Sequence, residues 1–241
     1  MLVELAAHWL VRVDHGPLTL ALAERLADQA VEQGVGRVCV TPSIPDAWTA
    51  HWSSVVGERY AELAAHLATR HPGLVLYRGA ESLWRGALDA DRAHAELSLA
   101  GLGQSLLVRL TADLDPARFE LALFHQKQIG RHTVLIAPEL VLDGRDAAET
   151  LARWTRMGAL VVVEADSLLG GRGKDTQRLV VEWCQHDIVY AITSSSFHPR
   201  HGPVRLAAAH RDLTKRFGQP YADEVCRDHP WALLEGRAPR G

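Results

Sequence analysis

Seven short runs of apolar residues recur along the chain at regular intervals. They are Leu2–Leu5, Val38–Val40, Leu74–Tyr77, Leu106–Leu110, Val134–Ile136, Leu160–Val163 and Ile188–Ile192. Each is rich in Val, Leu or Ile and lacks a regular alternation with polar residues, which is typical of strands that are buried on both faces of a parallel sheet. The pattern therefore predicts seven parallel strands.

The segments between these runs have helical spacing. Leu18, Leu22, Leu26 and Ala30 recur every four residues, and Gly34 follows where such a helix would end. Further helices are predicted around residues 56–67, 115–130, 146–158, 174–186 and 203–217. Strands that alternate with helices through short loops predict an α/β fold with right-handed crossovers. Seven such units favour a barrel, with an open doubly wound sheet as the alternative.

Composition adds limits to this picture. The 241 residues carry a net charge of −3, without the basic excess of a nucleic-acid-binding protein. Three widely spaced cysteines argue against a disulfide framework and favour a reducing compartment. Neither a signal peptide nor an apolar stretch of about 18 residues is present, so we expect a cytoplasmic protein that is not embedded in a membrane. With no linker or repeat, we predict one domain over residues 1–241, including a last helix at about 219–236.

Candidate chemistry lies where the strands end, because the site of a parallel barrel is built at the carboxyl ends of its strands. The polar or site-facing positions expected there are His8, Asp14, His15, Ser43, Glu81, Arg109, Thr111, Ala137, Glu139, Glu164, Asp166, Ser194, Ser195, Ser196 and His198. They form a polar rim, but a stable divalent metal site needs a better matched ligand set.

A series of short motifs extends along nearly the whole chain. They are Ala6-Ala7-His8, Val11–Pro17, Val40-Thr41-Pro42-Ser43, Gly79-Ala80-Glu81, Arg109-Leu110-Thr111, Ile136–Leu140, Ser167–Gly173, Thr193–Ser196, His201-Gly202-Pro203 and Tyr221–Pro230. In order and spacing the chain resembles the bacterial tyrosine-protein phosphatases of the polymerase-and-histidinol-phosphatase (PHP) superfamily, which act in capsular and exopolysaccharide synthesis. The resemblance implies a distorted seven-stranded (β/α)7 TIM-like barrel with a trinuclear metal site that activates water to attack phosphotyrosine.

Most of the metal ligands that the resemblance implies are replaced in this chain. The corresponding positions are Ala6, His8, Asp14, Ser43, Glu81, Arg109, Ala137, Ser194 and Ser196. Only His8, Asp14 and Glu81 keep a ligand type, so they are the remnant candidates for a metal. The phosphate-binding arginines of the family correspond to Leu140 and His201. Both the metal ligands and the phosphate-binding arginines that the resemblance implies are therefore largely replaced.

Arg109 changes the expected site most, because it places a permanent cation where the family has a carboxylate. Like charges about 4 Å apart repel by roughly 4 kcal/mol per unit charge at an effective dielectric near 20. A buried Glu81 needs a partner, and the guanidinium of Arg109 can supply charge-assisted hydrogen bonds. We therefore predict that Glu81 and Arg109 pair, with His8 or Asp14 nearby.

Some alternatives stay open from the sequence. We expect a cavity lined by Ser43, Glu81, Arg109, Ala137, Ser194, His198 and His201. A shift in the register of Thr193–His198 against the family motif would make His198 a ligand. Ser194–Ser196 with His198 lack the Gly-x-Ser-x-Gly frame of a nucleophile elbow.

Three functions are compatible with these residues. The first is a catalytically degenerate phosphatase homologue, a binding or regulatory protein of exopolysaccharide production, without a cofactor. By resemblance, its partner is a membrane-associated bacterial tyrosine kinase or the tyrosine-rich tail of that kinase. The second is an active phosphotyrosine phosphatase with a reduced site for manganese or another divalent metal, built from His8, Asp14, Glu81 and also His198 and His201. The third is an unrelated ligand-binding barrel.

Overall fold

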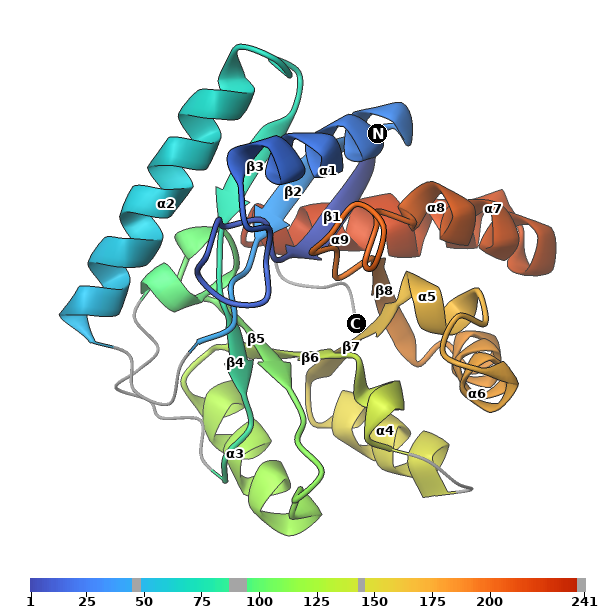
Figure 1. Cartoon of the computed structure of the whole chain (residues 1–241). Coiled ribbons are helices and arrows are strands. Elements are labelled where there is room, and N and C mark those ends of the chain that lie inside the picture. Colours follow the sequence, from blue (N-terminus) through green and yellow to red (C-terminus); the bar gives the residue numbers. More distant parts are fainter. Residues whose placement is uncertain (45–48, 87–94, 143–145, 238–241) are drawn as a thin grey trace.

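The strands of the protein lie at its centre and the long helices lie around them (Figure 1). The structure is a computed structural model that describes residues 1–44, 49–86, 95–142 and 146–237. The strands in these residues are β1 (Leu2–Ala7), β2 (Val35–Val40), β3 (Val75–Arg78), β4 (Glu81–Leu83), β5 (Ser105–Arg109), β6 (His132–Ile136), β7 (Ala159–Glu164) and β8 (Val189–Thr193). Each of the seven predicted runs overlaps one of these strands, and β4 is additional.

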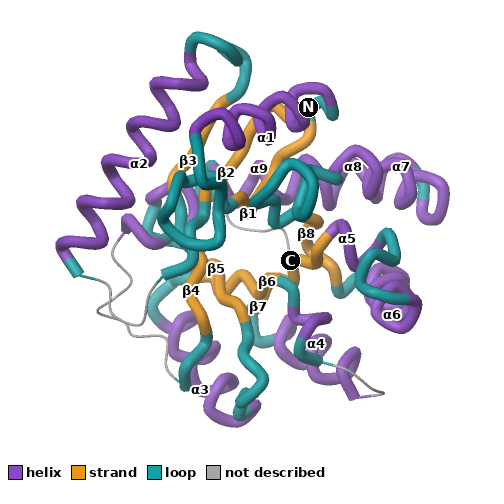
Figure 2. The backbone as a smooth tube through the Cα atoms, in the orientation of Figure 1, coloured by secondary structure: helices purple, strands orange, loops and turns teal. Residues whose placement is uncertain are grey.

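Helices connect most of the strands, and Figure 2 shows them on the outside of the strands. The α-helices are α1 (Leu20–Glu32), α2 (Ala50–Ala68), α3 (Pro116–Gln128), α4 (Asp146–Arg156), α5 (Ala165–Leu168), α6 (Lys174–Gln185), α7 (Leu206–Phe217), α8 (Gln219–Asp223) and α9 (His229–Leu234). Short 3-10 turns are η2 (Ala95–Leu97), η3 (Leu99–Gly101) and η4 (Pro138–Leu140), and η5 (Glu224–Asp228) is a π-helical segment between α8 and α9.

The strands form two parallel sheets, with the orders β1-β2-β3 and β4-β5-β6-β7-β8. Isolated bridges between Ala7 and Ser196 and between Ser43 and Glu81 connect segments of the two sheets. The α/β class and the parallel pairing are therefore confirmed. A clear seven-stranded barrel, as predicted, is not seen, because the described strands number eight and are divided between two sheets.

The division arises where the third predicted strand ends. β3 pairs with β2, whereas β4 pairs with β5, so the chain changes its partner strand at Gly79-Ala80. A side chain at Gly79 would lie 3.0 Å from the sulfur of Cys39 and 3.2 Å from Thr41. Glycine thus permits the close approach at which the chain leaves one sheet and enters the other.

Local signals in the sequence explain where several helices begin and end. Thr19 caps α1 by accepting a hydrogen bond from the backbone of Leu22, and Gly34 follows the helix with a φ of 74°. Asp115 caps α3 through the amides of Ala117 and Arg118. Buried leucines, valines and tryptophans then pack the helices against the sheets.

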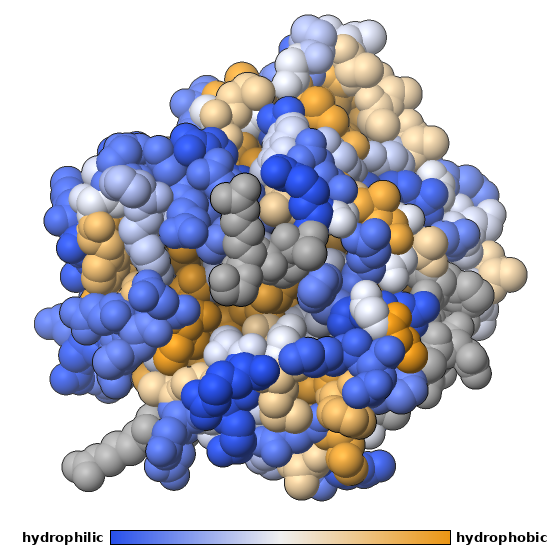
Figure 3. All heavy atoms as spheres, turned by 180° about the vertical axis from the view of Figure 1, so that it is seen from behind, coloured by the Kyte–Doolittle hydropathy of each residue, from blue (hydrophilic) through white to orange (hydrophobic). Residues whose placement is uncertain are grey.

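The chain after α7 folds back onto the strands through α8, η5 and α9. Its end contacts β1 and β8, and Leu233 and Leu234 are buried against them. Among the described helices none is long and apolar enough to span a membrane. Figure 3 shows hydrophobic residues interspersed with hydrophilic ones on the face opposite to that of Figure 1.

Candidate functional site

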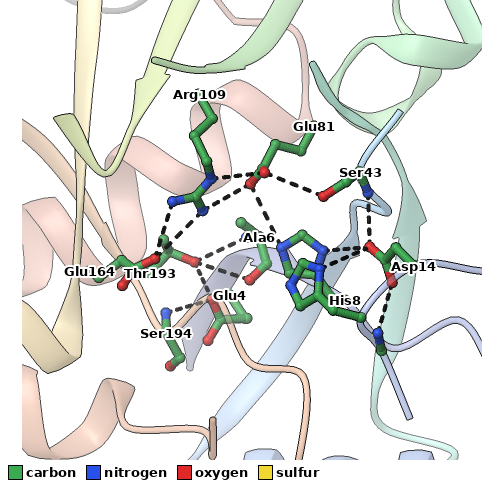
Figure 4. Close-up of polar contacts among 12 residues, drawn as sticks. Glu4, Ala6, His8, Asp14, Ser43, Glu81, Arg109, Glu164, Thr193 and Ser194 are labelled. Carbon is green, nitrogen blue, oxygen red and sulfur yellow. Dashed lines mark hydrogen bonds and ion pairs between the residues drawn. The ribbon is translucent and has the colours of Figure 1, made fainter. Parts of the chain in front are cut away.

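The centre of the candidate site is an ion pair between Glu81 and Arg109 (Figure 4). Arg109 donates from Nε to Oε1 of Glu81 at 2.8 Å and from Nη2 to Oε2 at 3.0 Å. Glu81 is 1% exposed. Burial alone would raise the pKa of Glu81, but hydrogen bonds from His8 and Arg109 hold this pKa at about 2. The predicted pairing is confirmed, and both carboxylate oxygens of Glu81 are engaged by the guanidinium.

His8 lies between two carboxylates. Its Nδ1 is 2.8 Å from Oδ2 of Asp14, and its Nε2 is 3.6 Å from Oε2 of Glu81. Burial would lower the pKa of His8, but the hydrogen bonds with Asp14 and Glu81 raise it to about 9. His8 therefore carries a proton at neutral pH and acts as a second cation in the cluster.

Asp14 is held by the loop that follows β1. Its Oδ1 accepts from the amide of Gly16 at 2.9 Å, and its Oδ2 accepts from the amide of Ser43 at 2.8 Å. A side chain at Gly16 would lie 2.6 Å from the carbonyl oxygen of His8, so the loop needs glycine there. Burial opposes ionisation of Asp14, but the hydrogen bond and the charge of His8 lower its pKa. We define the central cluster as His8, Asp14, Glu81 and Arg109.

Two buried carboxylates extend the site beyond the central cluster. Oε1 of Glu164 lies 3.5 Å from Nη2 of Arg109, and Oε2 accepts from Nη2 of Arg172 at 3.0 Å. Glu139 accepts from the amide of Glu164 at 2.8 Å. Burial, together with the charge of Glu164, raises the pKa of Glu139 to about 7. Arg109 thus links carboxylates that come from β4 and β7.

Positions that the resemblance assigns to lost metal ligands have structural roles here. Oγ of Ser196 accepts from the indole of Trp9 at 2.9 Å. Oγ of Ser194 accepts from the amide of Arg205 at 3.0 Å. The amide of Ser194 also donates to the buried Glu4 at 2.8 Å. Burial raises the pKa of Glu4.

Backbone geometry at two strand ends is unusual. Ala137 follows β6 with a φ of 51° and is buried, and Ser195 follows β8 with a φ of 48°. Non-glycine residues rarely adopt these values, and such strain often accompanies functional sites. Ala137 has this backbone conformation, although its methyl group offers no donor atom to a metal.

The structure brings part of the predicted set together. Ser43 lies next to the central cluster, with its Oγ 3.4 Å from Oε1 of Glu81. His198 and His201 lie in the loop after β8, with ring centroids 4.7 Å apart. In the described residues no hydrogen bond or ion pair joins either histidine to the central cluster.

Three charged residues of this region, Arg172, Arg205 and Glu4, were not among the predicted site residues. Arg172 and Arg205 come from loops, and only the fold brings them beside Glu164 and Asp166. Glu4 lies inside an apolar run, where a lone carboxylate was the available signal. Glu164, at the end of β7, was recognised only as part of the polar rim.

The sequence matches the family described as capsular polysaccharide synthesis, CpsB/CapC, over residues 2–235. The chain belongs to the CpsB/CapC family. No curated protein matches the sequence. A solved structure from work on YwqE of Bacillus subtilis and CpsB of Streptococcus pneumoniae, which are described as metal-dependent tyrosine phosphatases, superposes with a TM-score of 0.87. It is 20% identical and covers 98% of this chain and 95% of its own, so the likeness shows a shared fold.

The side chains of this CpsB/CapC protein do not fit a trinuclear metal site. A ligating histidine must be neutral, whereas His8 donates toward two carboxylates. Glu81 accepts from Arg109 with both oxygens. In the described residues one group, His8, Asp14 and His15, places possible ligand atoms within 4.8 Å of one another. The side chains of Arg109 and His8 therefore pair with the carboxylates that a metal cluster would need as ligands.

Proposed function

We propose that this CpsB/CapC protein is a catalytically degenerate phosphatase homologue that binds a component of capsular polysaccharide synthesis. The supporting observation is the two-point pairing of Arg109 with Glu81. Arg109 stands where the resemblance implies a carboxylate ligand, and its charge opposes binding of a cation. Metal-assisted phosphate hydrolysis needs bound cations to lower the pKa of water and to polarise the phosphoryl group.

His8 supports the same proposal. A general base must be unprotonated, but two carboxylates hold the pKa of His8 at about 9. Glu81, with a pKa of about 2, is tied to Arg109 and is a weak base. The central cluster is therefore a set of mutually neutralised charges without a group poised for proton transfer at neutral pH.

A paired assay tests this function. The purified protein is incubated with manganese and assayed with phosphotyrosine peptide and p-nitrophenyl phosphate, beside an active metal-dependent member of the family. We expect no hydrolysis above the background rate. Manganese-dependent turnover that disappears in Glu81→Ala would overturn the proposal, since a contaminating phosphatase would be insensitive to that substitution.

We propose a membrane-associated tyrosine kinase, through its tyrosine-rich tail, as the binding partner. Membership of a capsular polysaccharide synthesis family supports this role. The test is binding of a synthetic tyrosine-rich peptide in phosphorylated and unphosphorylated forms. Saturable binding supports the partner, and failure of both peptides to bind the folded protein excludes the tail.

One observation favours the second function, an active phosphatase with a reduced metal site. His8, Asp14 and His15 lie close enough to share one ion. For this function His8 must lose its proton and its hydrogen bond to Asp14. Activity that rises with manganese and is lost in His15→Ala would support this function instead of the degenerate one.

A further inference from the structure

A second polar cavity lies beside the central cluster, between the loops that follow β7 and β8. Its volume is about 150 Å³, and its walls include Glu164, Asp166, Arg172, Phe197, Arg200 and Arg205. We call it the arginine pocket. It is smaller than the roughly 300–1,000 Å³ of sites that enclose drug-sized ligands, so it suits a single small group.

Most of the charges in the arginine pocket are matched within its wall. Arg172 donates to Glu164 at 3.0 Å and lies 3.8 Å from Asp166. Nε of Arg205 lies 3.4 Å from Oδ1 of Asp166. Among the described residues Arg200 has no ion-pair partner, although it lines the same cavity. The pocket is thus left with one unmatched guanidinium.

This charge balance discriminates between classes of small ligand. A single carboxylate would neutralise Arg200, and a guanidinium can bind a carboxylate through two parallel hydrogen bonds. A phosphate monoester carries up to two charges, which would exceed the single unmatched cation. A zwitterion would bring an ammonium group for which no unmatched carboxylate remains in the described wall.

The opposite wall offers hydrogen-bond acceptors. The pairs of Asp166 with Arg172 and Arg205 are long, and its side chain is 32% exposed, so its oxygens keep capacity to accept from hydroxyl groups. Phe197 supplies an apolar ring in the same wall and is positioned by Gly202, because a side chain there would lie 2.1 Å from the ring. Acceptors, a ring and a cation together suit a polyhydroxylated acid.

We propose that the arginine pocket binds a small sugar acid, such as a hexuronate, through one carboxylate held by Arg200. The carboxylate pairs with this guanidinium, and the hydroxyl groups donate toward Asp166 and Glu164. The inference rests on the proposed function in one respect, namely that the protein binds its ligand without hydrolysing a phosphate ester.

Isothermal titration of the intact protein with glucuronate tests this site. We expect saturable binding that is at least tenfold tighter than binding of glucose, inorganic phosphate, phosphotyrosine or the zwitterion alanine. Methyl glucuronide is a further arm, and binding of this compound would show that the anomeric position can be linked to a chain. Absence of glucuronate binding at millimolar concentrations, or equal binding of phosphate or alanine, would overturn the assignment.

Substitutions of single arginines test whether glucuronate binds in the arginine pocket. Arg200→Gln should weaken glucuronate binding by about tenfold or more, the scale of a lost hydrogen-bonded charge contact. Arg211→Gln is the matched control, because Arg211 is an exposed arginine on α7 that does not line the pocket. Equal affinities of the two variants would contradict the role of Arg200.

The phosphatase assay separates this inference from the proposed function. Metal-dependent turnover with intact glucuronate binding would overturn the degenerate function and leave the pocket assignment standing. An inactive protein that fails to bind glucuronate would remove the pocket assignment only. Thermal melting of each variant confirms that a lost affinity does not come from unfolding.

Discussion

The central cluster and the arginine pocket are neighbours, because Glu164 contacts Arg109 of the cluster and lines the pocket, but they differ in how their charges are matched. In the central cluster Glu81 is almost fully buried, and its partners Arg109 and His8 occupy the oxygens that face them. In the arginine pocket the side chain of Asp166 is 3.4 Å from Arg205 and 3.8 Å from Arg172, and Arg200 is unmatched among the described residues.

This difference distinguishes charged residues that stabilise the fold from charged residues that remain available to bind a ligand. A buried pair whose partners satisfy each other holds the fold but leaves no capacity for a substrate or an ion. A more open wall with one excess charge can exchange water for a ligand. Under the function that we propose, the residues at the position of the implied metal site are structural, and ligand binding takes place in the adjacent pocket.

The largest expected effect comes from breaking the central pair on one side. Arg109→Ala leaves Glu81 buried without its guanidinium, and Glu81→Ala leaves Arg109 without its nearest carboxylate. Each should lower the free energy of unfolding by about 3–5 kcal/mol, with the double variant losing less than the sum. Denaturant unfolding measures the three values, and Arg178→Ala, at a side chain 78% exposed, is the control with little change. Strictly additive losses would show that the two residues do not act as a pair.

The pH dependence of stability should report the charge states of the central cluster and of the neighbouring Glu139. The pKa of His8 is raised from about 6.5 to about 9, so its stabilisation is complete below pH 6.5 and is lost as the pH rises to 9. The pKa of Glu139 is raised from 4.5 to about 7, so ionisation costs stability across that interval. The pKa of Glu81 is lowered from 4.5 to about 2. The ionised carboxylate therefore stabilises the folded state fully above pH 4.5, and this stabilisation is lost as the pH falls toward 2.

Stability should therefore be highest near pH 5 and should fall by a few kcal/mol up to pH 9, at about 1.4 kcal/mol for each unit of pKa change. Denaturant unfolding at intervals between pH 3 and 9 measures the profile. His8→Gln should flatten it above pH 6.5, and Glu139→Gln should flatten it between pH 4.5 and 7. A constant free energy of unfolding from pH 6.5 to 9 would contradict the charged state of His8.

Reversing the charge at residue 109 should alter metal affinity. Arg109→Glu places a third carboxylate near Glu81 and Glu164, which removes the cation that lowers the pKa of Glu81 and provides ligands for a divalent ion. We expect this variant to be less stable than the native protein and to gain melting temperature when manganese is added. Arg109→Gln removes the cation without adding a ligand and should respond less. An equal manganese response of both variants would show that no carboxylate site has formed.

The smallest effect is expected at Ser43. Its hydroxyl lies 3.4 Å from Glu81, which already has two hydrogen bonds from Arg109. Ser43→Ala should therefore cost less than about 1 kcal/mol in the free energy of unfolding. A loss as large as that of Arg109→Ala would mean that the hydroxyl, and not the guanidinium, stabilises the carboxylate.

The sequence predicted the strands wherever burial produced a continuous apolar run. It missed β4, because Glu81-Ser82-Leu83 is short and has two polar residues. The division into two sheets was also missed. The change of partner strand occurs at a glycine, and a glycine gives no hydrophobic pattern from which the change could be predicted. Helix ends were easier to predict, because Asp115 and Gly34 act within one turn of the chain.

The site was predictable where residues occupy motif positions along the chain. The pairing of Glu81 with Arg109 followed from the resemblance, which implies that both positions face one cavity, and from the need of a buried carboxylate for a partner. The arginine pocket was predicted only in part. Ser194 and His201 of the expected cavity line it, but Arg172 and Arg205 are separated by more than thirty residues and meet only through the packing of two loops. The resemblance also carried no information about Arg200, which lies outside the motif positions.

The metal content of the folded protein tests the central claim most directly. The protein is incubated with excess manganese, passed through a desalting column and analysed by mass spectrometry for bound metal, beside Arg109→Glu and an active family member. We predict that the native chain retains essentially no manganese while the active relative retains its full set. Stoichiometric retention of several metal ions by the native chain, with Arg109 unchanged, would contradict the claim that this guanidinium has replaced the metal charge.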